Sequence, residues 1–352
     1  MSTIGKVMRL FQQDCFNNGA SIIKWVVTMA FLSGCIKHVS AEHVHARPDS
    51  HAPIGVMGDH VMDKGEYMLS YRYMEMQMDG NRTGTDRVTT PLPSFMVSPL
   101  SMDMQMHMFG VMYAPTKELT LSLMVPVLSI SMDHRINMND VEFTTQSEGV
   151  GDISLAGVYL INSTASSNLL FNLRLSLSTG SIDEKDVLPV SAGVPVQLPY
   201  PMQTGSGTYD VTPGLTYRYI YPQWSWGMQG LYTWRLSDND NAYTLGNKLD
   251  ASLWAAKTLG HDMSLSVRLN ALRWENVDGA DNTLAAMPTV PTKNPELRGG
   301  HRVDALLGIN YIARSLNNIR FALEIGVPVY QDLNGPQLET DLVFTLGTQC
   351  TF

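Results

Sequence analysis

Methionine is the residue type whose number and spacing stand out in this chain. The 352 residues include 22 methionines, most of them before Asp140. Between Ser101 and Lys117 a methionine occupies almost every second position, which is the period of a β-strand and places these side chains on one face. Thioether sulfur is a soft ligand that suits Cu(I), so a row of such groups could bind a soft cation or pass it along.

Two neighbouring segments repeat the pattern, and we predict that all three place their methionines on one wall of an enclosed lumen. His107, Asp103 and Asp133 are close in sequence and are expected nearby. No three of these groups have a spacing that fixes a coordination geometry. Flexible filler for an irregular interior, or an apolar surface for aromatic or aliphatic molecules, remain alternatives. The candidate metal ligands are Met74, Met76, Met78, Met102, Met104, Met106, Met108, Met124, Met132 and His134.

Charged side chains are expected on the same inward face. Charges of both signs inside a small barrel can pair and fill it, or can line a wetted channel whose transverse field steers polar solutes. The sequence leaves both alternatives open. The predicted lumen charges are Arg72, Asp152, Arg174, Arg218, Asp250, Arg268, Asp304 and Glu324.

Residues 1–41 are predicted to be a signal peptide, because Lys24 precedes an apolar run of the length that an export signal needs. Cleavage after Ala41 and lipidation at Cys35 are the two processing alternatives. Residues 42–64 are predicted to be a histidine-containing periplasmic segment. That segment is either a flexible polar stretch or a loose metal-collecting arm, since neutral imidazole is the commonest metal ligand. Its histidines are His43, His45, His51 and His60.

Residues 65–352 are predicted to form an all-β, antiparallel, up-and-down transmembrane barrel of about twelve strands. Most of the expected strands exceed the ~9–11 residues that a tilted strand needs to cross a bilayer. The expected strands are 66–78, 101–114, 119–134, 149–162, 168–180, 208–221, 224–237, 247–259, 262–276, 301–313, 319–331 and 337–352.

The two faces of these segments differ in the way that lipid and a lumen require. In segment 262–276, Leu265, Val267 and Leu269 alternate with Ser266 and Arg268. The apolar face is almost free of charge in strand after strand, which suits hydrocarbon better than water. Tyrosines and tryptophans at 217–226 flank a short turn and are expected to form an interfacial aromatic girdle.

The lengths of the connections and the end of the chain support this assignment. Short turns alternate with long connections, which is typical of outer-membrane barrels. The last segment alternates up to the terminal Phe352, which resembles the signal by which barrel-assembly machinery recognises its clients. The formal charge of -9 and the pI near 5.4 argue against nucleic acid as a partner. The expected partners are therefore outer-membrane lipid, the assembly machinery and a small-molecule or metal-ion solute.

Catalytic motifs are not apparent. The chain lacks G-x-S-x-G, H-E-x-x-H and a P-loop, so we predict a protein that is not an enzyme and has no cofactor apart from a possible copper ion. An outer-membrane hydrolase that uses a serine and a histidine is the weaker alternative.

Several stretches resemble a known family. They are the segment from His51 to Gly58, the segment from Gly65 to Met74, the Met102–Thr116 strand, and Gly149-Val-Gly-Asp-Ile153. Together they resemble the bacterial outer-membrane proteins assigned to the meta pathway of phenol degradation, often labelled transporters, in a subgroup rich in Met and His. The resemblance covers residue 51 to the C-terminus and implies a barrel and small-molecule uptake or efflux. It implies no established substrate and no catalytic residues, and the methionine wall departs from what a phenol channel requires.

These observations predict an outer-membrane channel that binds or passes a small solute. The more specific hypothesis is that this solute is a soft metal ion such as copper. The alternative is a non-conducting structural or surface barrel. Substrate, direction of transport and oligomeric state do not follow from the sequence.

Overall fold

The computed structural model of the protein describes residues 47–189, 191–285 and 289–352. The predicted signal peptide, its alternative lipidation site and His43 and His45 lie outside the described residues. No helix in the described part of the chain is both long and apolar enough to cross a membrane.

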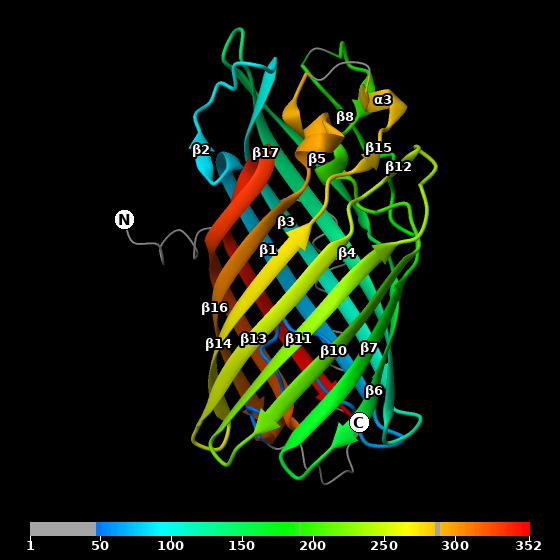
Figure 1. The fold of residues 1–352 in the computed structure, drawn as a ribbon, viewed down its shortest axis with the longest axis vertical. Helices are drawn as coiled ribbons and strands as arrows, with labels where there is room; N and C mark the ends of the chain where they lie inside the picture. The colour runs from blue at the N-terminus through cyan, green and yellow to red at the C-terminus, as the bar shows by residue number, and fades with distance from the viewer. Residues whose placement is uncertain (1–46, 190, 286–288) are drawn as a thin grey trace.

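Eleven strands close into one antiparallel barrel in which sequence neighbours pair and the last strand pairs with the first (Figure 1). Two further strands, β2 and β5, extend this sheet at one end. The barrel strands are β1 (Tyr67–Gly84), β3 (Val97–Tyr113), β4 (Leu119–Ile136), β6 (Ser154–Ser163), β7 (Ser167–Ser176), β10 (Asp210–Ile220), β11 (Trp224–Arg235), β13 (Lys248–Leu259), β14 (Met263–Trp274), β16 (Gly300–Ala313) and β17 (Ile319–Thr351).

The closing strand, β17, is 33 residues long and forms two antiparallel limbs of the wall. Its first part, from Ile319 to Leu333, pairs with β16, and the remainder pairs with β1. Because β17 contributes two limbs, the eleven labelled strands of the described wall span the barrel twelve times. This confirms the predicted barrel. Phe352 and Tyr67 exchange backbone hydrogen bonds of 2.8 and 3.2 Å, so the C-terminal residue completes the closure.

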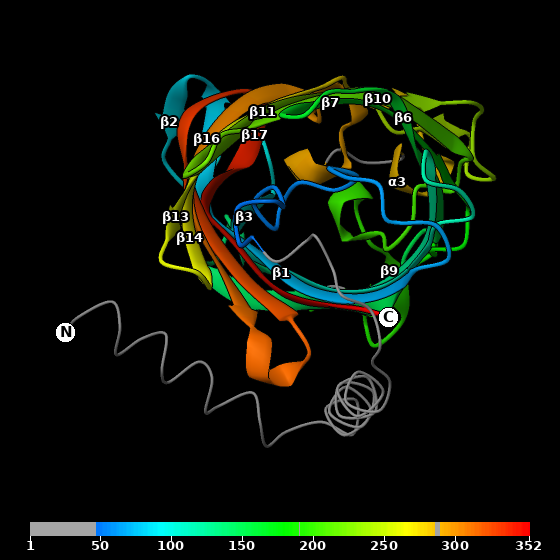
Figure 2. The ribbon, with the colours of Figure 1, turned by 90° about the horizontal axis from the view of Figure 1, so that it is seen from below.

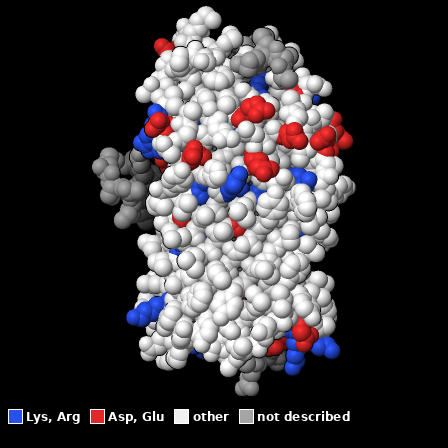
Figure 3. Space-filling model, in the orientation of Figure 1, with Lys and Arg blue, Asp and Glu red and all other residues white. Residues whose placement is uncertain are grey.

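Burial confirms the assignment of the two faces. On β14, Leu265 is 48% exposed and Val267 is 55% exposed, whereas Ser266 and Arg268 are buried at 4% and 8%. Exposed apolar side chains need hydrocarbon around them, and buried polar ones need partners inside. In Figure 3 the charged residues gather over the upper half and at the lower rim, and a band between them is almost free of charge.

The two ends of the barrel differ. Short turns join the strands at the lower end of Figure 1, where the C-terminus also lies, and long connections stand at the upper end. In outer-membrane barrels the short turns face the periplasm, so the upper end is the extracellular one. Tyr221 and Trp224 stack at 4.1 Å beside one of the short turns, as expected of an interfacial girdle.

The upper end is more ordered than the sequence predicts. The sequence predicts no strand between residues 134 and 149, but β4 runs to Ile136 and β5 (Val141–Val150) pairs back along it from residue 141. The predicted strand 149–162 is thus two strands, β5 and β6, separated near Gly151. Alternation continues above the membrane because the wall extends beyond the hydrocarbon. The other upper elements are β2 (Asp86–Val88), β8 (Lys185–Val187), β9 (Pro195–Gln197), η1 (Tyr200–Met202), β12 (Tyr243–Thr244), β15 (Asp278–Gly279), α3 (Asn282–Ala285), η2 (Pro291–Lys293) and η3 (Pro295–Leu297); η4 (Arg314–Leu316) forms a lower turn.

The segment before β1 does not stand apart from the barrel. Seen from below, it crosses the ring of strands inside the wall (Figure 2). Ala52, Ile54 and Val56 are each at most 4% exposed, and His60 is 3% exposed. We call residues 47–63 the plug.

Candidate functional site

The methionines of β1, β3 and β4 share the parity of the buried residues on these strands, and we call this row the methionine wall. Antiparallel register sets Met74 opposite Met106, Met76 opposite Met104, and Met78 opposite Met102. Opposed side chains in an antiparallel pair have Cβ atoms about 4.5–5.5 Å apart, so the paired thioethers can touch. The wall consists of Met68, Met74, Met76, Met78, Met102, Met104, Met106, Met108, Met112, Met124 and Met132.

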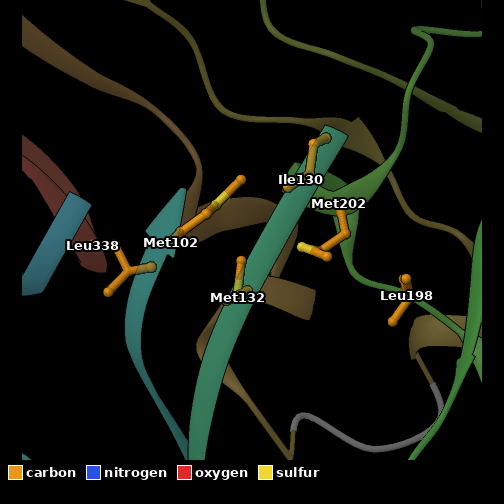
Figure 4. Close-up of a cluster of buried hydrophobic side chains, with 6 residues drawn as sticks. All are labelled: Met102, Ile130, Met132, Leu198, Met202 and Leu338. Atoms are coloured by element: carbon orange, nitrogen blue, oxygen red, sulfur yellow. The ribbon is translucent and has the colours of Figure 1, made fainter. Parts of the chain in front are cut away.

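The upper end of this wall is packed against a loop that turns inward. Met102 and Met132 are opposed in register and form a buried cluster with Met202 of η1 and Leu198 (Figure 4). Met202 is fully buried, and its carbonyl accepts a hydrogen bond of 2.6 Å from Ser147. These contacts are ordinary core packing, so flexible filler describes this end of the wall better than ligation does.

The lower end of the wall packs against the plug. Met68 and Met112 form a second buried cluster with Met62. Met112 and Met124 also line a cavity of about 30 Å³ between the plug and the wall, together with Asp59 and His60. A cavity of this size can hold a water molecule or a small ion.

The middle of the wall is only half-buried. Met74, Met106 and Met108 retain partial exposure between the two packed ends, and Met104, which is also half-buried, packs against the upper cluster. Met76 differs, because its sulfur accepts a contact of 3.3 Å from Arg302. A cation at this sulfur would meet the guanidinium, so Met76 is the least suitable ligand of the row.

Not all the expected neighbours join the wall. His134 is buried on the inward face but stacks on Phe143 at 5.0 Å, near the extracellular end. His107 occupies the opposite face of β3, where its Nδ1 lies 2.8 Å from the Tyr71 hydroxyl. Asp133 also faces outward and accepts a hydrogen bond of 2.6 Å from Thr144, and Asp103 shares that outward parity. The expectation that His107, Asp103 and Asp133 lie beside the methionines was wrong, since odd and even positions of one strand point to opposite faces.

The plug is held by polar side chains of the inner wall that bind its backbone. Ser264 donates to the Pro48 carbonyl at 2.9 Å and Ser225 donates to that of Asp49 at 2.9 Å. Arg320 donates to Ala52 at 2.6 Å, and Gln229 donates to Met57 at 2.8 Å. These bonds satisfy the carbonyl groups of an irregular segment within the barrel, where bulk water does not reach them. The four wall partners lie on β11, β14 and β17 and not on the methionine strands β1, β3 and β4.

One anchor of the plug is a three-residue junction. Arg268 forms two hydrogen bonds of 2.8 and 3.0 Å with the Glu324 carboxylate, and Gly55 N donates to that carboxylate at 3.0 Å. A Cβ at Gly55 would lie 2.4 Å from Arg268 and 2.5 Å from Glu324, so only glycine fits against the ion pair. The charge pair predicted to fill the lumen therefore also binds the plug.

The remaining predicted lumen charges have varied roles. Arg218 donates to the Ser50 carbonyl of the plug. Arg72 and Arg174 line the cavity beside the plug. Asp304 pairs with Arg302 at 3.0 Å, and Asp250 lies 3.8 Å from Lys248.

Asp152 is the exception among the predicted lumen charges. Its carboxylate accepts hydrogen bonds from Gly180 N at 2.9 Å and from Ser206 N and Oγ at 2.8 and 2.7 Å. It therefore ties the break between β5 and β6 to the loop before β10, a structural role at the upper rim. Gly151 beside it allows close packing, because a Cβ there would lie 2.5 Å from Leu128.

The sequence pattern did not reveal the plug, although one signal was present. Pro53 and the glycines at 55 and 58 mark a tight, irregular path, and Val56 N closes a turn on the Pro53 carbonyl at 2.9 Å. Burial raises the pKa of the Asp59 carboxyl in this path, but His60, His51 and Arg218 outweigh it and hold that pKa well below its usual range.

Gly58→Ala is expected to loosen the plug. Gly58 has a φ of +70°, and a Cβ there would lie 2.4 Å from Asn172 Oδ1. The left-handed conformation alone costs a non-glycine residue roughly 1–2 kcal/mol, and the contact adds to it. Faster proteolysis of the plug in the purified barrel would report the change. Gly193→Ala is the matched control, since its φ is +82° and no atom lies within 4 Å; equal proteolysis of the two variants would contradict the expected steric effect.

The comparisons with known proteins agree with this geometry. Residues 85–286 match the family described as "Putative MetA-pathway of phenol degradation". The chain belongs to this family. The resemblance noted in the sequence is thereby confirmed.

Solved structures extend the likeness to the fold. The COG4313 outer membrane channel from Pseudomonas putida F1 has 15% sequence identity to this chain, covers 84% of it and 98% of its own chain, and gives a TM-score of 0.60. More distant are the KdgM porin, with 12% identity, 81% and 99% coverage and a TM-score of 0.39, and the TodX monoaromatic hydrocarbon channel, with 10% identity, 84% and 92% coverage and a TM-score of 0.44. No curated protein matches significantly. The protein is an outer-membrane β-barrel with channel-like architecture.

Proposed function

We propose that the barrel passes a small solute along the methionine wall, and that a soft metal ion such as Cu(I) is the best candidate solute. The observation that carries this proposal is the cross-strand ladder of half-buried thioethers between the upper cluster and the plug. Soft sulfur ligands favour Cu(I) over the harder cations that carboxylates bind.

The spacing along the wall suits transfer between weak sites. Met104, Met106 and Met108 follow one another on the same face of β3, and Met74 stands opposite Met106. Successive side chains on one face of a strand are about 6.8 Å apart, so neighbouring sulfurs offer separate positions rather than one tight cage. Conduction requires sites that are favourable enough to enter and weak enough to leave.

A second candidate is an apolar solute, favoured by the description of the family as part of phenol degradation. Thioethers are polarizable and flexible and make favourable contacts with aromatic rings. The same half-buried surface would then serve as an apolar path.

Replacing Met104, Met106 and Met108 by Leu separates the two candidates, because leucine keeps the apolar bulk and removes the sulfur. Cu(I) binding by the purified barrel should fall about tenfold or more, since loss of even an outer-shell partner weakens metal sites by that much. Passage of an apolar solute should change little. Isothermal titration with a Cu(I) chelator complex measures the first property, and the rate of phenol entry into liposomes that contain the barrel, relative to empty liposomes, measures the second.

The matched control replaces three methionines outside the lumen by Leu. Met96, Met138 and Met228 are 56%, 84% and 50% exposed and lie away from the wall. If both triple variants bind Cu(I) as the unmodified barrel does, the metal proposal is wrong. If neither ions nor apolar solutes cross liposomes that contain the barrel, the alternative of a structural surface barrel gains support.

A further inference from the structure

We propose that His51, Asp59 and His60 form a binding site for a divalent first-row transition-metal ion within the plug. Among the described residues, these three buried side chains each offer a ligand atom, and the three atoms lie within 4.8 Å of one another. This inference goes beyond the passage of a solute along the methionine wall and does not depend on it.

The distances are close to those of a bound site. His60 Nδ1 lies 2.8 Å from Asp59 Oδ1, and His51 Nδ1 lies 4.0 Å from Asp59 Oδ2. Ligands held about 2.0–2.2 Å from Zn²⁺ in a tetrahedral site are roughly 3.4 Å apart, a value between these two separations. The imidazole rings lie edge to face with centroids 4.5 Å apart. Small rotations of the side chains would therefore bring the three ligands around one ion.

The backbone of the plug prepares this arrangement. Ala52 N donates to Asp59 Oδ2 at 2.7 Å and so closes the loop between the two histidines. The turn from Pro53 to Val56 lies inside that loop, and Gly55 N holds its tip on Glu324. A site whose ligands are fixed by surrounding hydrogen bonds loses less entropy when it binds an ion.

The set of ligands points to the class of ion. Imidazole is a borderline ligand, and a set of two imidazoles and one carboxylate suits Zn²⁺, Cu²⁺ or Ni²⁺. Asp59 and His60 also line the cavity of about 30 Å³, which offers room for a water molecule as fourth ligand. Three protein ligands with one further position is a common arrangement of zinc in proteins.

The guanidinium groups of Arg218 and Arg320 lie nearby and limit the affinity of the site for a cation, but they do not bind its ligand atoms. Arg218 donates to the Ser50 carbonyl, and Arg320 donates to Ala52 O and to Asn310. These guanidinium groups are thus directed at neutral oxygens rather than at the Asp59 carboxylate. We expect a site of moderate affinity that binds a metal when His51 and His60 are neutral.

A bound ion would tie the first part of the plug to its last part. His51 precedes the turn and His60 follows it, so metal would cross-link the loop that is seated in the lumen. Metal should therefore protect the plug from proteolysis, a consequence that a His–Asp hydrogen bond alone would not produce.

The test uses the purified full-length barrel in detergent and ZnCl₂ as the probe. Isothermal titration should show one Zn²⁺ per chain, and His51→Gln and His60→Gln should each lower the affinity at least about tenfold. Zn²⁺ should also slow proteolysis of the plug in the unmodified protein and in neither variant. Retained heat-modifiable migration in gels would verify that the variants are folded.

His261→Gln is the matched control, because His261 is exposed on a lower turn. It should leave both readouts unchanged. Zn²⁺ binding that is equal in all three variants, or binding without protection of the plug, would overturn the proposal. The Met104, Met106 and Met108 to Leu variant should still bind Zn²⁺ at the plug, so failure of this site and failure of the methionine path are distinguishable.

Discussion

Deletion of residues 48–61 is expected to raise the single-channel conductance of the barrel several-fold. The plug occupies the periplasmic half of the lumen and is bound there by side chains from several strands, including Ser264, Arg320 and Gln229. The deletion leaves Gly65, whose N–H bonds the Ala114 carbonyl, and all of β1. Water would then hydrate the wall side chains that the plug had satisfied, so the barrel should fold and conduct. Planar-bilayer recordings of refolded protein measure the effect.

The control for this deletion shortens an extracellular turn instead. Residues 191–194 lie in the connection between β8 and β9, three of them are exposed, and their replacement by two glycines should leave the conductance unchanged. If deletion of the plug and shortening of this turn give the same conductance as the intact chain, the plug does not limit passage.

Glu324→Ala is expected to lower the free energy of unfolding by about 3–5 kcal/mol, the usual cost of leaving one member of a buried ion pair without its partner. The Arg268 and Glu324 side chains are only 7% and 1% exposed, so solvent does little to compensate. The variant also removes the acceptor of Gly55 N. Urea unfolding in micelles should show the loss, and the plug should become more accessible to protease.

The exposed pair of Arg135 and Glu142 provides the comparison. These side chains lie 2.7 Å apart, but Glu142 is 58% exposed, and exposed pairs contribute little. Glu142→Ala should therefore leave the urea midpoint close to that of the intact chain. Equal shifts for Glu142→Ala and Glu324→Ala would show that the Glu324 junction does not stabilise the barrel. In the chain without the plug, Glu324→Ala should lower the free energy of unfolding by a smaller amount, because the hydrogen bond from Gly55 is already lost.

The sequence was sufficient for the wall of the barrel because its information is local. The alternation that places Leu265 outside and Arg268 inside follows from the period of the strand alone. The same rule correctly predicted that Met74, Met104 and Met106 share a face. Because odd and even positions point to opposite faces, the same rule places His107 and Asp133 on the face opposite the methionines.

Two features could not be predicted from alternation. The return of β5 along β4 depends on pairing above the membrane, where neither lipid nor length limits the strand. The plug has no period at all, because its backbone is satisfied by side chains from distant strands rather than by a ladder.

The sequence by itself determined a closed, lipid-facing wall and a row of thioethers that share one face of neighbouring strands, since both depend on which residue follows which. Only the tertiary structure decided what faces that row. Closure of the barrel brings Glu324 to Gly55 and folds the path from His51 to His60 into one cluster, and these contacts join residues whose separation along the chain carries no periodic signal.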